Sequence, residues 1–496
     1  MLKSVENADK PVDRIDVDPV NKKENRSLYQ ARIKVFPKRV SGTFRRLKWY
    51  VMAITLGIYY LTPWIRWDRG PYAPDQAVLV DIPGRRFYFF FIEIWPQEFY
   101  YIAGLLIMAG VGLFLVTSTV GRAWCGYTCP QTVWVDLFLV VERAIEGDRN
   151  ARIKLDKGPW TGDKIAKRLS KHTIWLIIAL ATGGAWIFYF ADAPTLARDF
   201  IAFDAPAVAY ITVGILTATT YIFGGHLREQ VCTYMCPWPR IQGAMLDEDS
   251  LTVTYNDWRG EPRSRHRKSV DDQLVGDCVD CNQCVAACPM GIDIRDGQQL
   301  ECITCALCID ACDSVMDKVG SPRGLISYST LQDYNASTRE APKHTSVRSF
   351  IRPRTFVYTA FWAMIGLVML YALLTRDRLD INVLHDRNPL AVTLSDGTVR
   401  NGYTVKILNM EAQPRTFSLA LEGLPGGFMA LAAGDGKRSR ELEIPVGPDE
   451  VHTIKVYVTA PRSALEGQET DFGFVVEDLG GDERAAYDAI FSRDNR

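Results

Sequence analysis

Long uncharged stretches dominate the pattern of hydrophobic and polar positions along this chain. A helix that crosses the hydrocarbon core of a membrane needs about 20 predominantly apolar residues, with about 17 as the lower limit. The first stretch lies near this limit and the other four exceed it. The pattern therefore predicts an α-helical, polytopic membrane domain with five spans, at residues 49–65, 99–121, 172–191, 205–227 and 355–375.

The loops between these stretches differ in lysine and arginine content, which sets the orientation of short membrane loops. Residues 143–171 contain nine basic residues, whereas residues 192–204 contain one arginine and three aspartates. The first loop is therefore expected at the cytoplasmic face and the second outside. This orientation, in a bacterial inner membrane, places the N-terminus and residues 246–345 in the cytoplasm and residues 380–496 in the periplasm.

The loop at residues 66–98 fits this orientation less well, because it carries four arginines on the predicted outer side. Its aromatic run at residues 85–91 is either an interfacial segment or an ordinary packed loop. The sequence leaves the exact number of spans open near residues 80–98 and 130–142.

Short alternating segments replace the long apolar stretches in the last quarter of the chain. Residues 403–407, 416–421, 454–458 and 472–476 alternate or are rich in β-branched and aromatic residues, and turn signals such as Asp396-Gly397 separate them. Many short strands over about 110 residues suit an all-β, immunoglobulin-like sandwich. This segment has no cysteine and therefore carries no thiolate chemistry.

Charge and cysteine usage narrow the class of protein. A net charge of −1 gives no reason to expect a nucleic-acid partner. All twelve cysteines lie between residues 125 and 312, and each falls in a motif with metal or redox spacing. This usage indicates a reducing compartment rather than a secreted disulfide scaffold.

Two near-copies of one cysteine motif lie within residues 278–312. The spacing is that of a bacterial two-cluster ferredoxin, in which the fourth cysteine of each run serves the other cluster. Structural zinc or disulfides are the alternative, but zinc sites use paired Cys-x-x-Cys units. One 4Fe-4S cluster is therefore assigned to Cys278, Cys281, Cys284 and Cys312, and a second to Cys302, Cys305, Cys308 and Cys288.

The remaining cysteines form two copies of Cys-x-Tyr-x-Cys-Pro, each following a pair of apolar stretches and each preceded by an arginine. Both motifs are expected at the cytoplasmic membrane face, where a two-fold arrangement would bring four sulfurs together. Soft thiolates select Cu(I), zinc or iron-sulfur clusters, and a close pair can also cycle between dithiol and disulfide. Buried, structural cysteines are the alternative. The residues are Cys125, Cys129, Cys232 and Cys236, with Arg122 and Arg228 before them.

Proline sets the local structure of the first copy. Pro130 disfavours helical geometry at Cys129 and suits the first position of a helix that is predicted to run towards Glu142. A thiol at a helix N-terminus has a lowered pKa, so Cys129 is expected to be thiolate-like. Pro237 and Pro239 make a regular helix less certain after the second copy.

Three further features have two interpretations each. His226 is interpreted as an interfacial polar residue rather than a ligand, and Met235 either offers a thioether or packs. Basic residues 263–268 either contact anionic lipid or an acidic electron donor, or form a solvated loop. No nucleotide or flavin motif is evident, so electrons must come from a partner.

The expected domain order is a disordered cytoplasmic tail, a membrane domain with four spans, an inserted two-cluster ferredoxin-like domain, a fifth span and a periplasmic sandwich. Their boundaries are expected at residues 1–43, 44–245, 246–345, 350–376 and 380–496.

In this order of parts the chain resembles the CcoG family, also called FixG, which comprises accessory proteins of cbb-type cytochrome oxidase. The resemblance implies two 4Fe-4S clusters at the eight ferredoxin cysteines. It also implies a cupric reductase that reduces Cu(II) to Cu(I) for the oxidase. The implied catalytic and copper-binding residues are Cys125, Cys129, Cys232 and Cys236.

The expected function is therefore that of a membrane-bound iron-sulfur oxidoreductase, with membrane lipid, copper-delivery proteins and the nascent oxidase as partners. The cytoplasmic electron donor, a homo-oligomeric state and the occupant of the four-thiol site (copper, a third cluster or disulfides) stay open. One alternative is a quinol-linked electron-transfer subunit without a metal substrate. A second is a non-enzymatic assembly scaffold for the oxidase.

Overall fold

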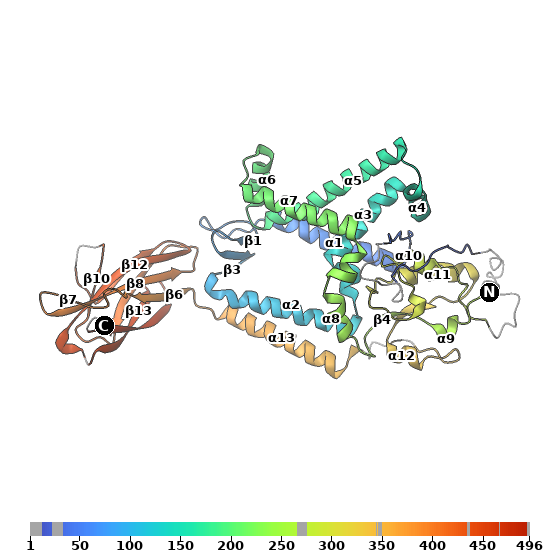
Figure 1. Ribbon diagram of the computed structural model, residues 1–496. Coiled ribbons are helices and arrows are strands. Elements are labelled where there is room, and N and C mark those ends of the chain that lie inside the picture. Colours follow the sequence, from blue (N-terminus) through green and yellow to red (C-terminus); the bar gives the residue numbers. More distant parts are fainter. Residues whose placement is uncertain are drawn as a thin grey trace. The chain divides into compact units, whose positions relative to one another are not determined.

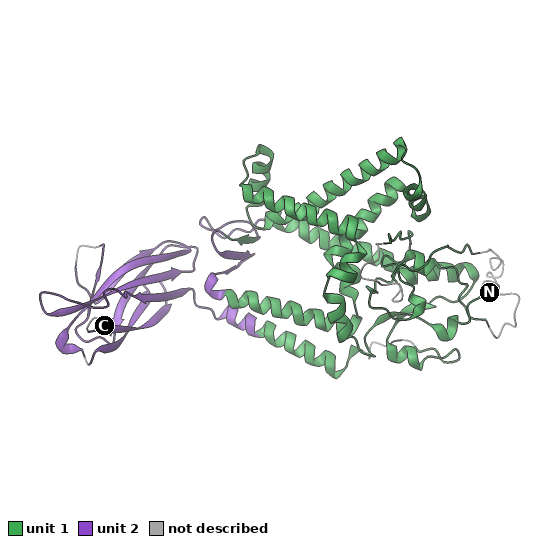
Figure 2. Ribbon diagram, viewed as in Figure 1, with its two compact units in different colours: residues 1–64, 79–82, 99–367 green, residues 65–78, 83–98, 368–496 purple. Residues whose placement is uncertain are grey.

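The computed structural model describes residues 12–21, 33–264, 275–343, 345, 350–433, 437–465 and 467–493. It divides into two compact units, which are described separately (Figure 2). Unit 1 comprises residues 1–64, 79–82 and 99–367, and unit 2 comprises residues 65–78, 83–98 and 368–496. All twelve cysteines belong to unit 1.

Helices form most of the first half of the chain (Figure 1). Four helical segments of the described residues are long and apolar enough to cross a membrane: Pro96–Val120, Gly162–Tyr189, Ala207–Leu227 and Pro353–Leu374. They contain α2 (Phe99–Val120), α5 (Gly162–Gly183), α7 (Ala207–Tyr221) and α13 (Pro353–Leu374). Shorter helices connect them: α3 (Pro130–Glu146), α4 (Arg149–Lys157), α6 (Ala193–Ala202) and α8 (Trp238–Met245).

Four of the five predicted spans meet this measure within the described residues, and the first does not. The first apolar stretch belongs to α1 (Thr43–Leu61), which does not reach the same apolar standard. Arg45, Arg46 and Lys48 occupy the start of this helix and shorten its uncharged part, so a crossing by α1 stays a prediction.

The ferredoxin-like region of unit 1 combines a two-stranded sheet with short helices. Strands β4 (Thr252–Tyr255) and β5 (Ile326–Ser329) pair antiparallel, and α9 (Asp257–Gly260) and α12 (Leu331–Ala336) follow them. The other two helices begin inside the cysteine runs, α10 (Gln283–Ala287) in the first and α11 (Leu307–Val319) in the second. The repeat in the sequence is therefore also a repeat in structure.

Buried polar contacts tie α1 to α3 and α11. Arg45 and Lys48 both pair with Asp136 of α3, at 3.2 and 2.9 Å. The carboxylate of Asp310 in α11 accepts hydrogen bonds from the backbone N–H groups of Phe44 (3.2 Å) and Arg45 (2.7 Å). Because loss of one partner from a buried ion pair is strongly destabilising, these contacts hold α1 against both helices.

The described part of the N-terminal segment differs from the disordered tail expected at residues 1–43, of which residues 1–11 and 22–32 lie outside the described residues. Over residues 12–21 and 33–42 it has no helix or strand, and it is hydrogen-bonded to the ferredoxin-like region. The backbone N–H of Ile15 donates to the Cys281 carbonyl at 3.0 Å, and that of Lys38 donates to the Ala286 carbonyl at 2.7 Å. Backbone hydrogen bonds of this kind need no apolar sequence pattern, which is why composition misses them.

The C-terminal part of unit 2 is the predicted all-β sandwich. One sheet has the order β10-β12-β8-β6 with β7 beside β8, and the other has the order β11-β9-β13-β14. Tyr403, Phe417, Phe474 and Phe491 are fully buried between them. The strands are β6 (Leu379–His385), β7 (Val392–Thr393), β8 (Thr398–Asn409), β9 (Arg415–Glu422), β10 (Phe428–Leu431), β11 (Glu441–Val446), β12 (Glu450–Pro461), β13 (Glu469–Asp478) and β14 (Arg484–Ser492).

The aromatic run at residues 85–91 forms part of a hairpin in which Tyr88 is buried, whereas Phe89, Phe90 and Phe91 are exposed. It follows β1 (Val78–Asp81) and contains β2 (Arg86–Phe89), which pairs with β3 (Ile92–Ile94). Arg86 lies 3.3 Å from Glu93, donates to the backbone carbonyl of Asp449 in the sandwich and stacks over Trp95 at 4.0 Å. Burial, together with the Asp449 carboxylate, raises the pKa of Glu93 to about 7.

This raised pKa predicts a pH-dependent contact between the hairpin and the sandwich. The folded state binds the Glu93 proton more tightly than the unfolded state, so its contribution to stability is present below about pH 4.5 and is lost as the pH rises through about 7. Hydrogen exchange of the residue 86–94 amides, corrected for intrinsic rates, is expected to show stronger protection at pH 5.5 than at pH 8.

Glu93→Gln keeps the neutral form at every pH and is expected to remove the difference in protection. Glu443→Gln, on an exposed position of β11, is the matched control and should keep it. Equal protection of the wild-type hairpin at both pH values would contradict the prediction.

Candidate functional site

The first set of ferredoxin cysteines lines one cavity. Cys278, Cys281, Cys284 and Cys312 border it, together with apolar side chains that include Val315. These are the four residues that the crossed pairing assigns to one cluster. The fourth cysteine comes from the second run, where it lies on α11.

The second set lines a neighbouring cavity. Cys284 borders this cavity as well as the first, so the two spaces are adjacent. Within the described part of the chain, no three His, Cys, Asp or Glu side chains are close enough to hold a single metal ion. The four assigned cysteines at the second cavity are Cys302, Cys305, Cys308 and Cys288.

The two cysteine runs share a backbone pattern, in which the N–H of Gln283 reaches the Cys281 thiol and that of Thr304 reaches the Cys302 thiol. Asp280 and Asn282 have positive φ angles of 48° and 57°, and Thr304 and Ala306 repeat this pattern with 56° and 59°. Non-glycine residues rarely adopt this conformation, and successive turns of this kind form anion-binding nests that are found at iron-sulfur sites. The loops are therefore shaped for an anionic group.

Burial dominates the chemistry of these thiols. It raises the pKa of Cys288 and Cys312 to about 12 and that of Cys302 to about 11. The backbone N–H of Thr304 partly offsets the effect at Cys302. Soft metal ions bind the thiolate form, so a positively charged metal group would have to displace these protons.

The two Cys-x-Tyr-x-Cys-Pro copies adopt the same local structure. Each contains a π-helical turn, Trp124–Thr128 or Val231–Met235, and then an extended cysteine before the next helix. The Cys129 N–H donates to the Trp124 carbonyl at 2.9 Å, and the Cys236 N–H donates to the Val231 carbonyl at 2.8 Å. α3 begins at Pro130, as the sequence predicts, and after Pro237 the shorter α8 follows.

All four thiols of these motifs lie within electrostatic range of one another. Cys129, Cys125 and Cys236 each add to the pKa of Cys232, which burial raises to about 12. Burial likewise raises the pKa of Cys125 to about 11. The four-thiol site, defined as Cys125, Cys129, Cys232 and Cys236, holds free cysteines rather than disulfides.

The prediction that Cys129 has a lowered pKa is wrong. Burial raises the pKa of Cys129, and the backbone N–H groups of Gln131 and Thr132 offset only part of this effect. The helix N-terminus is present, but the loss of water around a buried thiol outweighs it.

The four-thiol site packs directly against the second cysteine cavity. Cys125 and Cys232 contact the same apolar cluster as Cys288 and Cys302. A Cβ atom on Gly126 would lie 2.7 Å from the Ile303 carbonyl oxygen and 3.0 Å from the Cys305 Cα. Only glycine allows this approach of one backbone to the other.

Polar contacts reinforce the same junction. The hydroxyl of Tyr127 lies 3.3 Å from that of Tyr328, which donates to the Thr304 carbonyl at 2.7 Å. On the other side, the buried Gln242 accepts from the Cys125 thiol at 3.1 Å and donates to Thr117 at 3.2 Å. The tyrosine of the first motif is therefore a structural link to the ferredoxin-like region.

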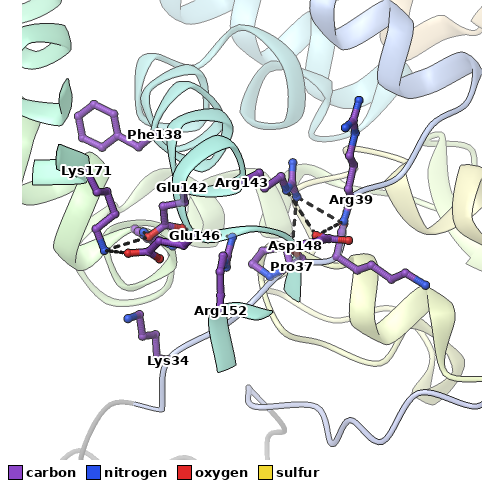
Figure 3. A network of polar contacts seen from close by, with 12 residues as sticks. Lys34, Pro37, Arg39, Phe138, Glu142, Arg143, Glu146, Asp148, Arg152 and Lys171 are labelled. Carbon is purple, nitrogen blue, oxygen red and sulfur yellow. Dashed lines mark hydrogen bonds and ion pairs between the residues drawn. The ribbon is translucent and has the colours of Figure 1, made fainter. Parts of the chain in front are cut away.

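The two motif arginines have different surroundings, although the sequence presents them alike. Arg228 lies 2.5 Å from Glu142. Glu142 also pairs with Arg152 and Lys171, and Lys171 reaches Glu146 at 3.0 Å (Figure 3). Arg122 instead donates to the Leu300 carbonyl, two residues before Cys302.

Two of the ambiguous residues can now be placed. His226 is exposed and stacks on His172 with a ring separation of 5.7 Å, which fits an interfacial role. Met235 is 54% exposed, so it is not a packed core residue. Residues 265–268 of the basic run lie outside the described residues. Sequence reasoning missed Gln242, Asp136 and Tyr328, since none belongs to a motif.

Comparison with known proteins supports the composite architecture. Residues 102–146 match a 4Fe-4S binding domain, residues 227–331 a 4Fe-4S dicluster domain, and residues 369–493 the IG-like fold at the C-terminus of FixG. The chain is 62% identical to the nitrogen fixation protein FixG of Rhizobium meliloti, over 97% of both chains. It is 55% identical to protein RdxB of Cereibacter sphaeroides, over 94% of this chain and 97% of the relative.

One solved structure resembles only part of the chain. A FixG-related protein from Vibrio parahaemolyticus is 25% identical and covers 24% of this chain and 97% of its own, with a TM-score of 0.21.

The close backbone approach at Gly126 predicts a sharp response to one added methyl group. Gly126→Ala forces the Cβ into the Ile303 carbonyl, and overpacking of this kind costs roughly 1–3 kcal/mol. Iron and acid-labile sulfide per chain are expected to fall towards about half, because one of two cluster loops is displaced. Gly110→Ala is the control, since a Cβ there meets nothing within 4 Å. Full iron content in the Gly126 variant would contradict the prediction.

Proposed function

The chain belongs to the FixG family of membrane iron-sulfur proteins, and we propose that it is a metal reductase that converts Cu(II) to Cu(I) at the four-thiol site. One observation carries this proposal: the thiols of Cys125 and Cys232 share an apolar cluster with Cys288 and Cys302 of the second cysteine cavity. A redox-active group in that cavity and a soft-metal site in the motifs would therefore be neighbours.

The cysteine cavities fit two 4Fe-4S clusters. We assign Cys278, Cys281, Cys284 and Cys312 to the first, and Cys302, Cys305, Cys308 and Cys288 to the second. The two cysteine-lined cavities, the backbone N–H groups at Cys281 and Cys302, and the crossed contribution of Cys288 and Cys312 support this assignment. Clusters of this type supply one-electron transfer when bound.

The four thiols bind and hold the substrate in this proposal. Cu(II) takes up one electron and becomes Cu(I), and an external one-electron donor is oxidised in turn. Binding releases thiol protons, because metal ions take the thiolate form. Soft sulfur ligands then favour retention of Cu(I). Gln242 orients Cys125 by accepting its S–H hydrogen bond.

The orientation in the membrane follows from the loop charges. We place the N-terminal segment and the ferredoxin-like region in the cytoplasm and the β-sandwich in the periplasm. The electron donor then docks from the cytoplasm. The copper product serves assembly of a cbb-type oxidase, as the family resemblance implies.

A second function is favoured by one specific observation. The match to a 4Fe-4S binding domain at residues 102–146 includes Cys125 and Cys129. A third cluster at the four-thiol site would make the chain an electron relay without a metal substrate. Iron analysis separates the two, since two clusters give about eight iron atoms per chain and three give about twelve.

Loss of the motif thiols tests the reductase directly. The double variant Cys129→Ser/Cys236→Ser is expected to lose at least about tenfold of its Cu(II) reduction rate, because hydroxyls are poor ligands for Cu(I). Formation of Cu(I) is followed with a Cu(I)-specific chelator and a chemical one-electron donor. Iron per chain should stay at the wild-type value, because the eight ferredoxin cysteines are unchanged.

Tyr234→Phe is the control, since the side chain of Tyr234 lies in the second motif and is 47% exposed. This variant should reduce copper at the wild-type rate. A double variant that keeps both its iron and the wild-type rate would exclude the four-thiol site from the reaction.

A further inference from the structure

Arg122 is a buried cation that no carboxylate of the described residues pairs with. It is 4% exposed, and its guanidinium donates to the Leu300 carbonyl while its Nε has no hydrogen-bond partner. Across the described ranges of the chain, Arg122 forms no ion pair within 4 Å. Burying an unpaired charge is costly, so this position calls for an anion that the side chains alone do not supply.

Other buried arginines near the cysteines are compensated. Arg228, four residues before the first cysteine of the second motif, is paired with Glu142 at 2.5 Å. Arg295, beside the first cysteine cavity, pairs with Asp293 at 2.7 Å and with Asp280 at 2.9 Å. Among these three buried arginines of the described residues, Arg122 alone has no carboxylate within ion-pair distance.

The location of Arg122 indicates that the negative charge that balances it lies at the cysteines. It precedes Cys125 by three residues in the chain, and its hydrogen bond reaches the loop two residues before Cys302. The guanidinium acts against burial to lower the pKa of Cys125, Cys232 and Cys302. It therefore faces thiols of both the four-thiol site and the second cavity.

Three other charged groups act on the second cavity. The Glu301 carboxylate is buried beside Cys302 and acts on its thiol with the opposite sign to Arg122. Lys48 and Asp136 act on Cys305 with opposite signs, and they are paired with each other at 2.9 Å. Arg122 and Glu301 thus act on Cys302 with opposite signs.

We propose that Arg122 is a positioning residue whose fixed charge favours electron uptake at the site of Cys302, Cys305, Cys308 and Cys288. Addition of one electron makes that site more negative, and a cation in a poorly hydrated environment stabilises the added charge. The charge, hydrogen bonding and burial around an iron-sulfur centre set its reduction potential. The inference rests on the proposed cluster assignment, but it does not require copper.

The test is an anaerobic redox titration of the full-length protein, followed by electron paramagnetic resonance and without added copper. Arg122→Gln and Arg122→Met are each expected to lower the midpoint potential of one of the two clusters. The expected change is about tenfold in the ratio of reduced to oxidised cluster at fixed potential, which equals about 59 mV for a one-electron couple. The other cluster should keep its wild-type midpoint.

Glu301→Gln is the matched control of opposite sign, and it should raise the midpoint of the same cluster. Unchanged midpoints, or equal shifts of both clusters, in an Arg122 variant with full iron would overturn the proposal. If both Arg122 variants lose iron, Glu301→Gln decides: a rise in one midpoint supports the proposal, and no rise overturns it. Because no copper is present, failure of copper reduction in the wild type would count only against the reductase.

Discussion

The contact between Gly126 and the backbone around Ile303 and Cys305 is the constraint on which the candidate site depends. It brings the first Cys-x-Tyr-x-Cys-Pro motif against the loop of the second cysteine run at a distance that no larger residue permits. Around it, Tyr127 and Tyr328 form a polar link, and Gln242 fixes the thiol of Cys125. The membrane helices and the ferredoxin-like region thereby form a single junction.

Buried charge organises the rest of unit 1 around that junction. Asp136 holds Arg45 and Lys48, and Asp310 caps the helix that carries them. Removal of one partner from such a pair is strongly destabilising, so α1, α3 and α11 keep one arrangement. Arg122 is the exception, because no carboxylate of the described residues pairs with it and it faces the cysteines instead. Asp136 and Asp310 thus have a structural role, and the neighbouring buried charge of Arg122 has the proposed redox role.

Sequence patterns predicted much of this architecture. Cysteine spacing identified both cavity sets, because the ligand geometry of a cluster imposes a fixed spacing on the chain. Alternating residues predicted the β-sandwich, and Pro130 predicted the start of α3. The first predicted span is the least certain from composition, because α1 carries charged residues in the same helix as the apolar ones.

Contacts between distant segments left no sequence signal. Glycine at position 126 is compatible with many backbone conformations, and nothing local shows that Ile303 lies against it. The expected thiolate at Cys129 failed for a related reason, since burial is a property of the whole fold. Residues 12–21 pack through backbone hydrogen bonds, which composition does not record.

Single-turnover mixing tests the central claim most directly. The protein is reduced anaerobically, excess reductant is removed, and the visible absorbance is followed after addition of Cu(II). The account predicts recovery of the oxidised absorbance with one Cu(I) formed per electron, and a rate at least about tenfold lower in Cys125→Ser/Cys232→Ser. An equal rate in that variant, with iron content unchanged, would show that electrons reach copper without the four-thiol site and would contradict the account.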